Sequence, residues 1–154
     1  MAIVKKLKQH PPLPPSRYEV GIYCRVSTES KTQIVSVGHQ LSGLIADVAN
    51  SYQARLYDVY LDIQSGRTSD NRKNLMRLLD DCRAGRVTLV YTKSISRFAR
   101  NTVDVLTIVR ELKKMNVPVY FENEQLYSFD KEAELAISLH GAIAQGESEN
   151  KSEN

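Results

Sequence analysis

Four arginines and one serine have residue types and positions that suit chemistry on a phosphate. The serine is Ser27, and the arginines are Arg25, Arg72, Arg97 and Arg100. A guanidinium is a planar cation that binds phosphate oxygens two at a time, and a serine hydroxyl can act as a nucleophile. If these side chains meet in the fold, they would hold a phosphodiester while Ser27 attacks it.

The physical logic of such a site is electrostatic. Attack on a phosphodiester concentrates negative charge on the non-bridging oxygens and on the departing oxygen. Fixed cations aimed at these oxygens stabilise the transition state more than the ground state. A covalent intermediate divides the transfer into two steps and conserves the bond energy, so no ATP is required. The sequence has no acidic cluster of the metal-ligand type, and we expect neither a metal nor another cofactor.

The candidate residues lie near the ends of predicted strands. An apolar strand is predicted over Glu19–Val26 and ends beside Ser27. A second apolar strand, Val87–Tyr91, leads into the segment 94–100, and the turn-like run Asp62–Gly66 lies between the two. In an open α/β sheet, ligands bind beyond the carboxyl ends of the strands. We therefore expect the polar clusters to converge at one edge of the sheet.

The remaining pattern alternates between strands and helices. Further strands are predicted at Ala54–Leu61 and Val117–Phe121, and helices over about 39–48, 75–82 and 105–112. We expect a polar loop from Ser27 to about Ser36, a helix cap at Gly85 and a helix start near Asn101. Pro118 places the last strand near a sheet edge. The alternation predicts an α/β fold with a mostly parallel central sheet flanked by helices on both faces.

The two ends of the chain differ from its middle. Residues 1–17 form a basic leader with four prolines in 11–15, which we expect to be an extended, flexible arm. A proline-rich ligand for another domain is the alternative. Residues 131–154 have a helical pattern with a broad apolar surface, made by Leu135, Ile137, Leu139, Ile143 and Ala144. This surface indicates packing against another subunit, or else a core helix with a frayed end.

Composition sets wider bounds. The 154 residues fit one domain, and a net charge of +3 does not by itself indicate a nucleic-acid partner. Cys24 and Cys82 show neither disulfide nor metal-type spacing, so we expect a cytoplasmic protein. No apolar run reaches the roughly 18 residues of a membrane span, and the start lacks a secretory signal.

Taken together, several segments resemble the signatures of the serine site-specific recombinases, the resolvase/invertase family. The segments are Tyr23–Thr28, Ser65-Gly66 with Arg72, and Ser96–Asn101, while Ala144–Glu147 is similar to the start of that family's long dimerising helix. The resemblance covers about Tyr18 to Glu149. It implies a recombinase catalytic domain over residues 18–130 and the truncated start of an oligomerisation helix over 131–154.

The resemblance also implies roles for the site residues. Ser27 would be the nucleophile that forms a phosphoserine link to a DNA end. The scissile phosphate would be bound and polarised by Arg25, Arg72, Arg97 and Arg100. Gln40 and Ser65 match positions that help to order such a site.

Two further positions bear on the mechanism. The resolvase branch has an aspartate where this chain has Ser96, and a serine there matches the large serine recombinase and transposase branch. Asp62 is a candidate for acid–base work, with a structural role as the alternative. No residue is assigned as the general base for Ser27, because a nearby arginine stays protonated.

The function implied by the resemblance is site-specific recombination of double-stranded DNA. Both strands would be cut, held as 5′-phosphoserine esters, exchanged and rejoined without ATP. The family implies a homodimer at each site, a tetramer in synapsis and a separate DNA-binding region after the long helix. We expect the isolated fragment to be inactive without that region. The sequence specifies neither the DNA target nor the choice between integration, excision, inversion and transposition.

Two alternatives remain open from the sequence. One is a catalytically inactive domain of the same fold that regulates or assembles on DNA. The other is an α/β enzyme that binds a small phosphate compound or a nucleotide. Such an enzyme is expected to carry a glycine-rich turn between strand and helix, and the segment 27–36 contains no glycine.

Overall fold

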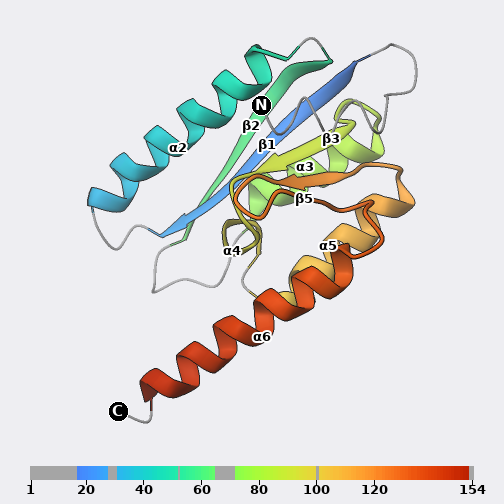
Figure 1. Cartoon of the computed structure of the whole chain (residues 1–154). Coiled ribbons are helices and arrows are strands. Elements are labelled where there is room, and N and C mark those ends of the chain that lie inside the picture. The colour runs from blue at the N-terminus through green and yellow to red at the C-terminus, as the bar shows by residue number, and fades with distance from the viewer. Residues whose placement is uncertain (1–16, 28–30, 52, 65–71, 100, 153–154) are drawn as a thin grey trace.

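Strands and helices alternate along the chain, as the sequence pattern predicts (Figure 1). The computed structural model describes residues 17–27, 31–51, 53–64, 72–99 and 101–152. For residues 27, 31–34 and 144–152 within these ranges, it describes the backbone but not the side chains. The strands are β1 (Tyr18–Ser27), β2 (Ala54–Gln64), β3 (Leu89–Thr92), β4 (Val119–Phe121) and β5 (Leu126–Tyr127). The helices are α2 (Lys31–Ala49), α3 (Lys73–Arg83), α4 (Ile95–Phe98), α5 (Thr102–Lys114) and α6 (Ala133–Ser152).

The strands form one sheet in the order β2-β1-β3-β4-β5. The first four are parallel, and β5 pairs antiparallel with β4. In the register between β1 and β2, Arg25 lies beside Asp62 and Ser27 lies beside Gln64. Because β1 to β4 are parallel, their carboxyl ends meet at one edge of the sheet. The predicted α/β fold with a mostly parallel sheet is confirmed.

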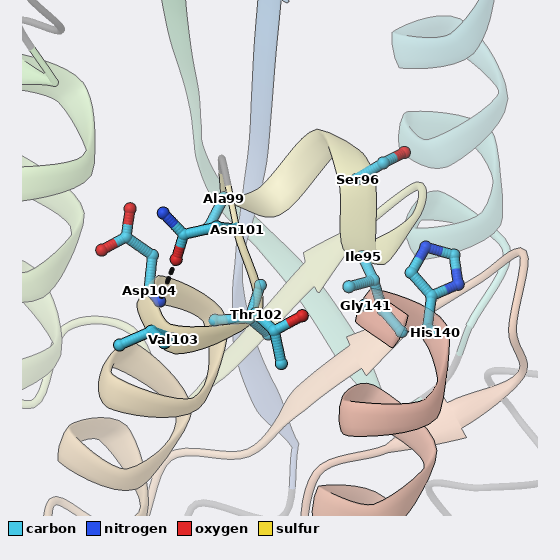
Figure 2. Close-up of a pocket in the computed structure, with 10 residues that line it drawn as sticks. Ile95, Ser96, Ala99, Asn101, Thr102, Val103, Asp104, His140 and Gly141 are labelled. Atoms are coloured by element: carbon cyan, nitrogen blue, oxygen red, sulfur yellow. Dashed lines mark hydrogen bonds between the residues drawn. The ribbon is translucent and has the colours of Figure 1, made fainter. Parts of the chain in front are cut away.

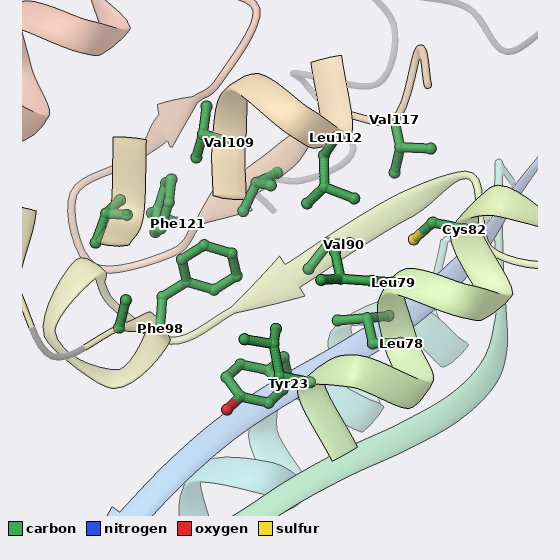
Figure 3. Packing of buried hydrophobic residues seen from close by; sticks show 14 of the residues in the cluster. Tyr23, Leu78, Leu79, Cys82, Val90, Phe98, Val109, Leu112, Val117 and Phe121 are labelled. Carbon is green, nitrogen blue, oxygen red and sulfur yellow. The ribbon is translucent and has the colours of Figure 1, made fainter. Parts of the chain in front are cut away.

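Helices cover both faces of this sheet, with α2 on one side and α3 and α5 on the other (Figure 1). β1 contributes to both apolar layers, since successive side chains of a strand point to opposite faces. Ile22 shares a buried cluster with Leu44 of α2. Tyr23 shares the opposite cluster with Leu78 of α3 and Leu112 of α5 (Figure 3). The strand that carries the site residues is therefore fixed from both faces.

Two predicted boundaries were wrong. The loop expected to reach Ser36 ends by residue 30, because α2 already begins at Lys31; three polar residues, Lys31, Thr32 and Gln33, precede the first apolar residue of the helix. The run predicted as a turn from Asp62 continues β2 as far as Gln64. Pairing with β1 along this stretch outweighs the low strand propensity of aspartate.

Two short elements lack a sequence signal. The helix α4 has four residues and the strand β5 has two, which is too few for a period to develop. β5 lies beyond β4 at the edge of the sheet, so β4 is next to the edge strand, and the prediction that it lies near a sheet edge is confirmed. Pro118 is tolerated because it precedes β4 and contributes its carbonyl oxygen, which accepts a bond from the Val90 N–H at 2.9 Å.

The predicted helix ends near α3 and α5 are confirmed. Gly85 follows α3 with a φ of 77°, a left-handed conformation that suits glycine. Asn101 caps α5, and its side-chain oxygen accepts the Asp104 N–H at 2.9 Å. The last turns of α6 project away from the rest of the fold (Figure 1). None of the helices in the described part of the chain combines the length and apolar character needed to cross a bilayer.

Candidate active site

Six of the nine predicted site residues have described side chains. They are Arg25, Gln40, Asp62, Arg72, Ser96 and Arg97. Ser65 and Arg100 lie outside the described residues, and for Ser27 the backbone alone is described, as the last residue of β1. The geometry of the site therefore comes from the groups around the end of β1.

Three of these residues have a buried polar atom without a partner. Nη1 of Arg25, Nε of Arg72 and Oε1 of Gln40 are buried, and within the described residues none has a hydrogen-bond partner. Such atoms are uncommon, since an unsatisfied buried polar group costs about 1–3 kcal/mol. Two of the three are guanidinium nitrogens, which need an acceptor. An anionic ligand would supply it.

Arg72 connects three helices. It precedes α3, and its side chain is 12% exposed. Its Nη2 donates to the Phe98 carbonyl oxygen at 2.8 Å, and its Nη1 lies 3.7 Å from Oδ2 of Asp104. The positive charge of Arg72 also opposes the rise in the pKa of Tyr23, which burial causes first and the hydrogen bond to Asp62 second. Arg72 therefore lies close to the carboxyl half of β1.

Arg97 approaches β1 from α4. The neighbouring Phe98 anchors this helix, because its buried ring packs edge-on against Tyr23 at 5.9 Å and Phe121 at 5.4 Å between centroids. Burial raises the pKa of the Cys24 thiol, and the Arg97 guanidinium opposes that rise. Arg72 and Arg97, from separate segments, thus both act on the end of β1 that carries Arg25.

Asp62 is occupied by protein donors. One carboxylate oxygen accepts the Tyr23 hydroxyl at 2.8 Å and the Leu75 N–H at 3.0 Å, and the other accepts the Asn74 N–H at 2.9 Å. The residue is 6% exposed. These bonds secure the start of α3, just after Arg72. The geometry favours the structural alternative over acid–base work for Asp62.

Ser96 and Gln40 lie at the margins of the cluster. Ser96 is exposed, with its hydroxyl oxygen 3.1 Å from that of Ser94. It lines a hollow of about 640 Å³ together with Thr102 and His140 (Figure 2). The described walls of this hollow contain no arginine. Gln40 belongs to α2, which covers the opposite face of the sheet from α3.

Three supporting residues were missed by the sequence reasoning. The Tyr23 hydroxyl donates to Asp62. Asp104 forms an ion pair with Arg72, and the Phe98 carbonyl oxygen accepts a bond from Arg72. Tyr23 and Phe98 lie inside the signature segments, which could have pointed to them. No sequence pattern indicated which residues they would contact. Asp104 lies 32 positions after Arg72, and no local pattern links the two.

The family model described as "Resolvase, N terminal domain" matches residues 20–154. The chain belongs to the resolvase family of serine recombinases. A relative from Bacillus subtilis (strain 168) is 30% identical over 131 residues, which are 83% of this chain and 25% of that protein. The R46 site-specific recombinase of Escherichia coli is 28% identical over 125 residues, 81% of this chain and 60% of that protein. The chain thus spans less than two thirds of the length of these recombinases.

Two solved structures share the fold. A resolvase family site-specific recombinase from Streptococcus pneumoniae superposes with a TM-score of 0.66 at 28% identity, covering 88% of this chain and 91% of that one. The N-terminal catalytic domain of TP901-1 integrase gives a TM-score of 0.61 at 22% identity, covering 86% and 98%. Because its identity is only 22%, the second match supports the fold and nothing further.

Proposed function

We propose that this chain is the catalytic domain of a serine recombinase that cuts and rejoins double-stranded DNA at specific sites. The observation that supports the proposal is that the charges of Arg72 and Arg97 act on Tyr23 and Cys24, the two residues before Arg25 on β1, the strand that ends at Ser27. Family membership supports the same reaction class.

Ser27 is the nucleophile of the proposed reaction. Its Oγ forms a bond to phosphorus, and the bond between phosphorus and the 3′ oxygen breaks, which leaves a 5′-phosphoserine and a free 3′ hydroxyl. The serine proton passes to a base that is not assigned, and the departing oxygen takes up a proton. Attack by a 3′ hydroxyl on the phosphoserine reverses these steps and rejoins the strand without ATP.

The arginines supply charge to this reaction. Nη1 of Arg25 and Nε of Arg72 are buried donors without an acceptor among the described residues. In the proposal they bind non-bridging oxygens of the scissile phosphate, and Arg97 and Arg100 complete the cationic site. A preorganised cation in a dry site stabilises the transition state without reorganising.

Oligomerisation through α6 completes the proposal. Leu135, Leu139 and Ile143 are spaced four apart, so they share one helix face, and all three are largely exposed. A second copy of the chain would cover this apolar face, in a dimer on each DNA site and a tetramer in synapsis. At the start of α6, Glu134 contacts α5 through an ion pair with Arg110 at 2.7 Å.

The alternative is an inactive domain of the same fold that regulates or assembles on DNA. One observation favours it: Nη2 and Nη1 of Arg72 each already have a protein partner, the Phe98 carbonyl oxygen and Asp104. In an active enzyme, the phosphate would bind Nε of Arg72 and the second hydrogens of its two Nη atoms.

A covalent-trapping experiment decides between the two. The chain, extended by its DNA-binding region, is incubated with a supercoiled plasmid that carries its target site, and protein linked to DNA is isolated under denaturing conditions. The wild type and the matched control Ser42→Ala, an exposed serine on α2, should yield the adduct, and Ser27→Ala should not. An adduct that persists in Ser27→Ala, or is absent from the wild type, rules out the proposed nucleophile.

A further inference from the structure

We propose that Glu124 is a positioning residue that holds α4, and through it Arg97, in place for the reaction proposed above. The inference rests on that proposed function. Glu124 lies in the turn between β4 and β5, and its Oε1 accepts the backbone N–H of Ile95 at 2.6 Å. Ile95 is the first residue of α4, and Arg97 lies two positions later.

α4 needs such an external contact. A helix of four residues makes almost no hydrogen bonds of its own, and forming a first turn is unfavourable. Its internal cap is weak, since the Ser94 hydroxyl oxygen accepts the Arg97 N–H at 3.3 Å. The bond that the Ile95 N–H donates to the Glu124 carboxylate is shorter and stronger, because its acceptor is charged.

The turn that carries Glu124 is itself firmly placed. The Glu122 N–H donates to the Thr92 carbonyl at 3.0 Å, and the Asn123 N–H donates to the Lys93 carbonyl at 2.8 Å. The turn therefore extends the pairing of β3 and β4 up to the residue before Ser94. Glu124 continues this contact onto α4 through its side chain.

A second carboxylate in the same turn provides a matched control. Glu122 accepts the Lys93 ammonium at 3.0 Å, a contact before α4 begins. Loss of either glutamate removes one negative charge from the turn. Only loss of Glu124 frees the Ile95 N–H at the start of the helix that carries Arg97.

The consequence for the reaction is geometric. Without Glu124, α4 can shift relative to β1, and a displacement of roughly 1 Å at a catalytic group can slow a reaction about a hundredfold. Binding of DNA depends on many other contacts, so the loss should fall on the rate of cleavage and not on affinity.

The test compares Glu124→Ala, Glu124→Gln and Glu122→Ala in the protein extended by its DNA-binding region. The rate of covalent cleavage is measured on saturated DNA, and DNA affinity is measured separately. Glu124→Ala should cleave about a hundredfold more slowly with unchanged affinity. Glu124→Gln should recover most of the rate, because its amide oxygen still accepts the Ile95 N–H, and Glu122→Ala should behave as the wild type.

A double-mutant cycle separates positioning from a general structural effect. In an Arg97→Ala background, Glu124→Ala should have little further effect on the rate, because the residue it positions is gone. The inference is overturned if Glu124→Ala cleaves normally, if Glu122→Ala is equally slow, if Glu124→Gln fails to recover, or if the two losses add.

The role of Glu124 can be tested even if the proposed recombinase activity is not found. If the wild type forms no covalent adduct, the Nε–Hε resonance of Arg97 replaces the cleavage assay. That resonance should shift in Glu124→Ala and return towards its original position in Glu124→Gln. An unchanged resonance in Glu124→Ala overturns the inference independently of catalysis.

Discussion

The Arg72 guanidinium donates a hydrogen bond to the Phe98 carbonyl oxygen at 2.8 Å across a separation of 26 residues. This bond joins the start of α3 to the end of α4, and the ion pair with Asp104 at 3.7 Å extends the connection to α5. A planar guanidinium can serve both partners from separate nitrogens, which a single ammonium does poorly.

Arg72→Lys should therefore lower both stability and cleavage. We expect about 1–2 kcal/mol less free energy of unfolding in urea, because the Phe98 carbonyl loses its donor, together with strongly reduced cleavage. Arg55→Lys is the control, since Arg55 is 65% exposed, lies 3.8 Å from Glu19 and should change little. A lysine at 72 that preserves both properties would show that the bridging geometry is unimportant.

Replacement of Asp62 distinguishes an anchor from an acid–base group. Asp62→Asn leaves buried donors facing an amide nitrogen, so we expect a loss of about 1–3 kcal/mol in the free energy of unfolding. Asp58→Asn, at a half-exposed carboxylate, should cost about 1 kcal/mol or less. If Asp62→Asn unfolds like the wild type but no longer cleaves DNA, Asp62 takes part in the chemistry and the structural assignment fails.

Gly141 allows α6 to approach α5 closely (Figure 2). A Cβ at this position would lie 1.5 Å from Oγ1 and 2.8 Å from Cβ of Thr102, so α6 or Thr102 has to move in Gly141→Ala. We expect a loss of about 1–3 kcal/mol in thermal or urea unfolding. Gly43→Ala in α2, where the new Cβ meets nothing within 4 Å, should instead stabilise by up to about 1 kcal/mol. Equal stabilisation by both changes would contradict the close approach.

Buried tyrosines should make the fold sensitive to alkali. Burial raises the pKa of Tyr23, Tyr60 and Tyr91, and a hydrogen bond from each phenol to a carboxylate raises it further. The folded pKa of each lies above the unfolded value of about 10. The stabilisation is complete below that pH and is lost as the pH rises, because the unfolded chain releases these protons first.

Absorbance of tyrosinate and circular dichroism, followed together through an alkaline titration, check this prediction. These phenols should ionise as the fold is lost, and Tyr23→Phe should weaken the dependence of stability on pH by one group. Complete ionisation of the tyrosines while the dichroism still reports a folded chain would contradict it.

Much of the fold could be predicted because long helices and strands show a hydrophobic period in the sequence. The helix α3 buries Leu75, Leu78, Leu79 and Cys82 at helical spacing, and β1 is apolar over most of its length. The helix α4 and the strand β5 escaped prediction because elements so short show no hydrophobic period, and the start of α2 did so because its first three residues are polar. Their placement depends on contacts between distant segments, such as Glu124 with Ile95.

The candidate site could be predicted in part for the same reason. Residue types and strand ends suggested that Arg25, Arg72 and Arg97 would meet, and this stays a prediction, although Arg72 and Arg97 both act on β1 at Tyr23 and Cys24. The connection of Arg72 to Phe98 was not predictable, since it depends on how far α4 folds back towards α3. The role of Asp62 was left open for a similar reason: its two donors from α3 are backbone N–H groups.

Peptide mapping of the protein–DNA adduct tests the central claim most directly. The adduct is formed on a target duplex, digested with protease and nuclease, and sequenced by mass spectrometry to find the residue that carries the nucleotide. We predict a 5′-phosphate ester on Ser27. A nucleotide attached to Ser94, Ser96 or a tyrosine, or linked through a 3′ phosphate, would contradict the account.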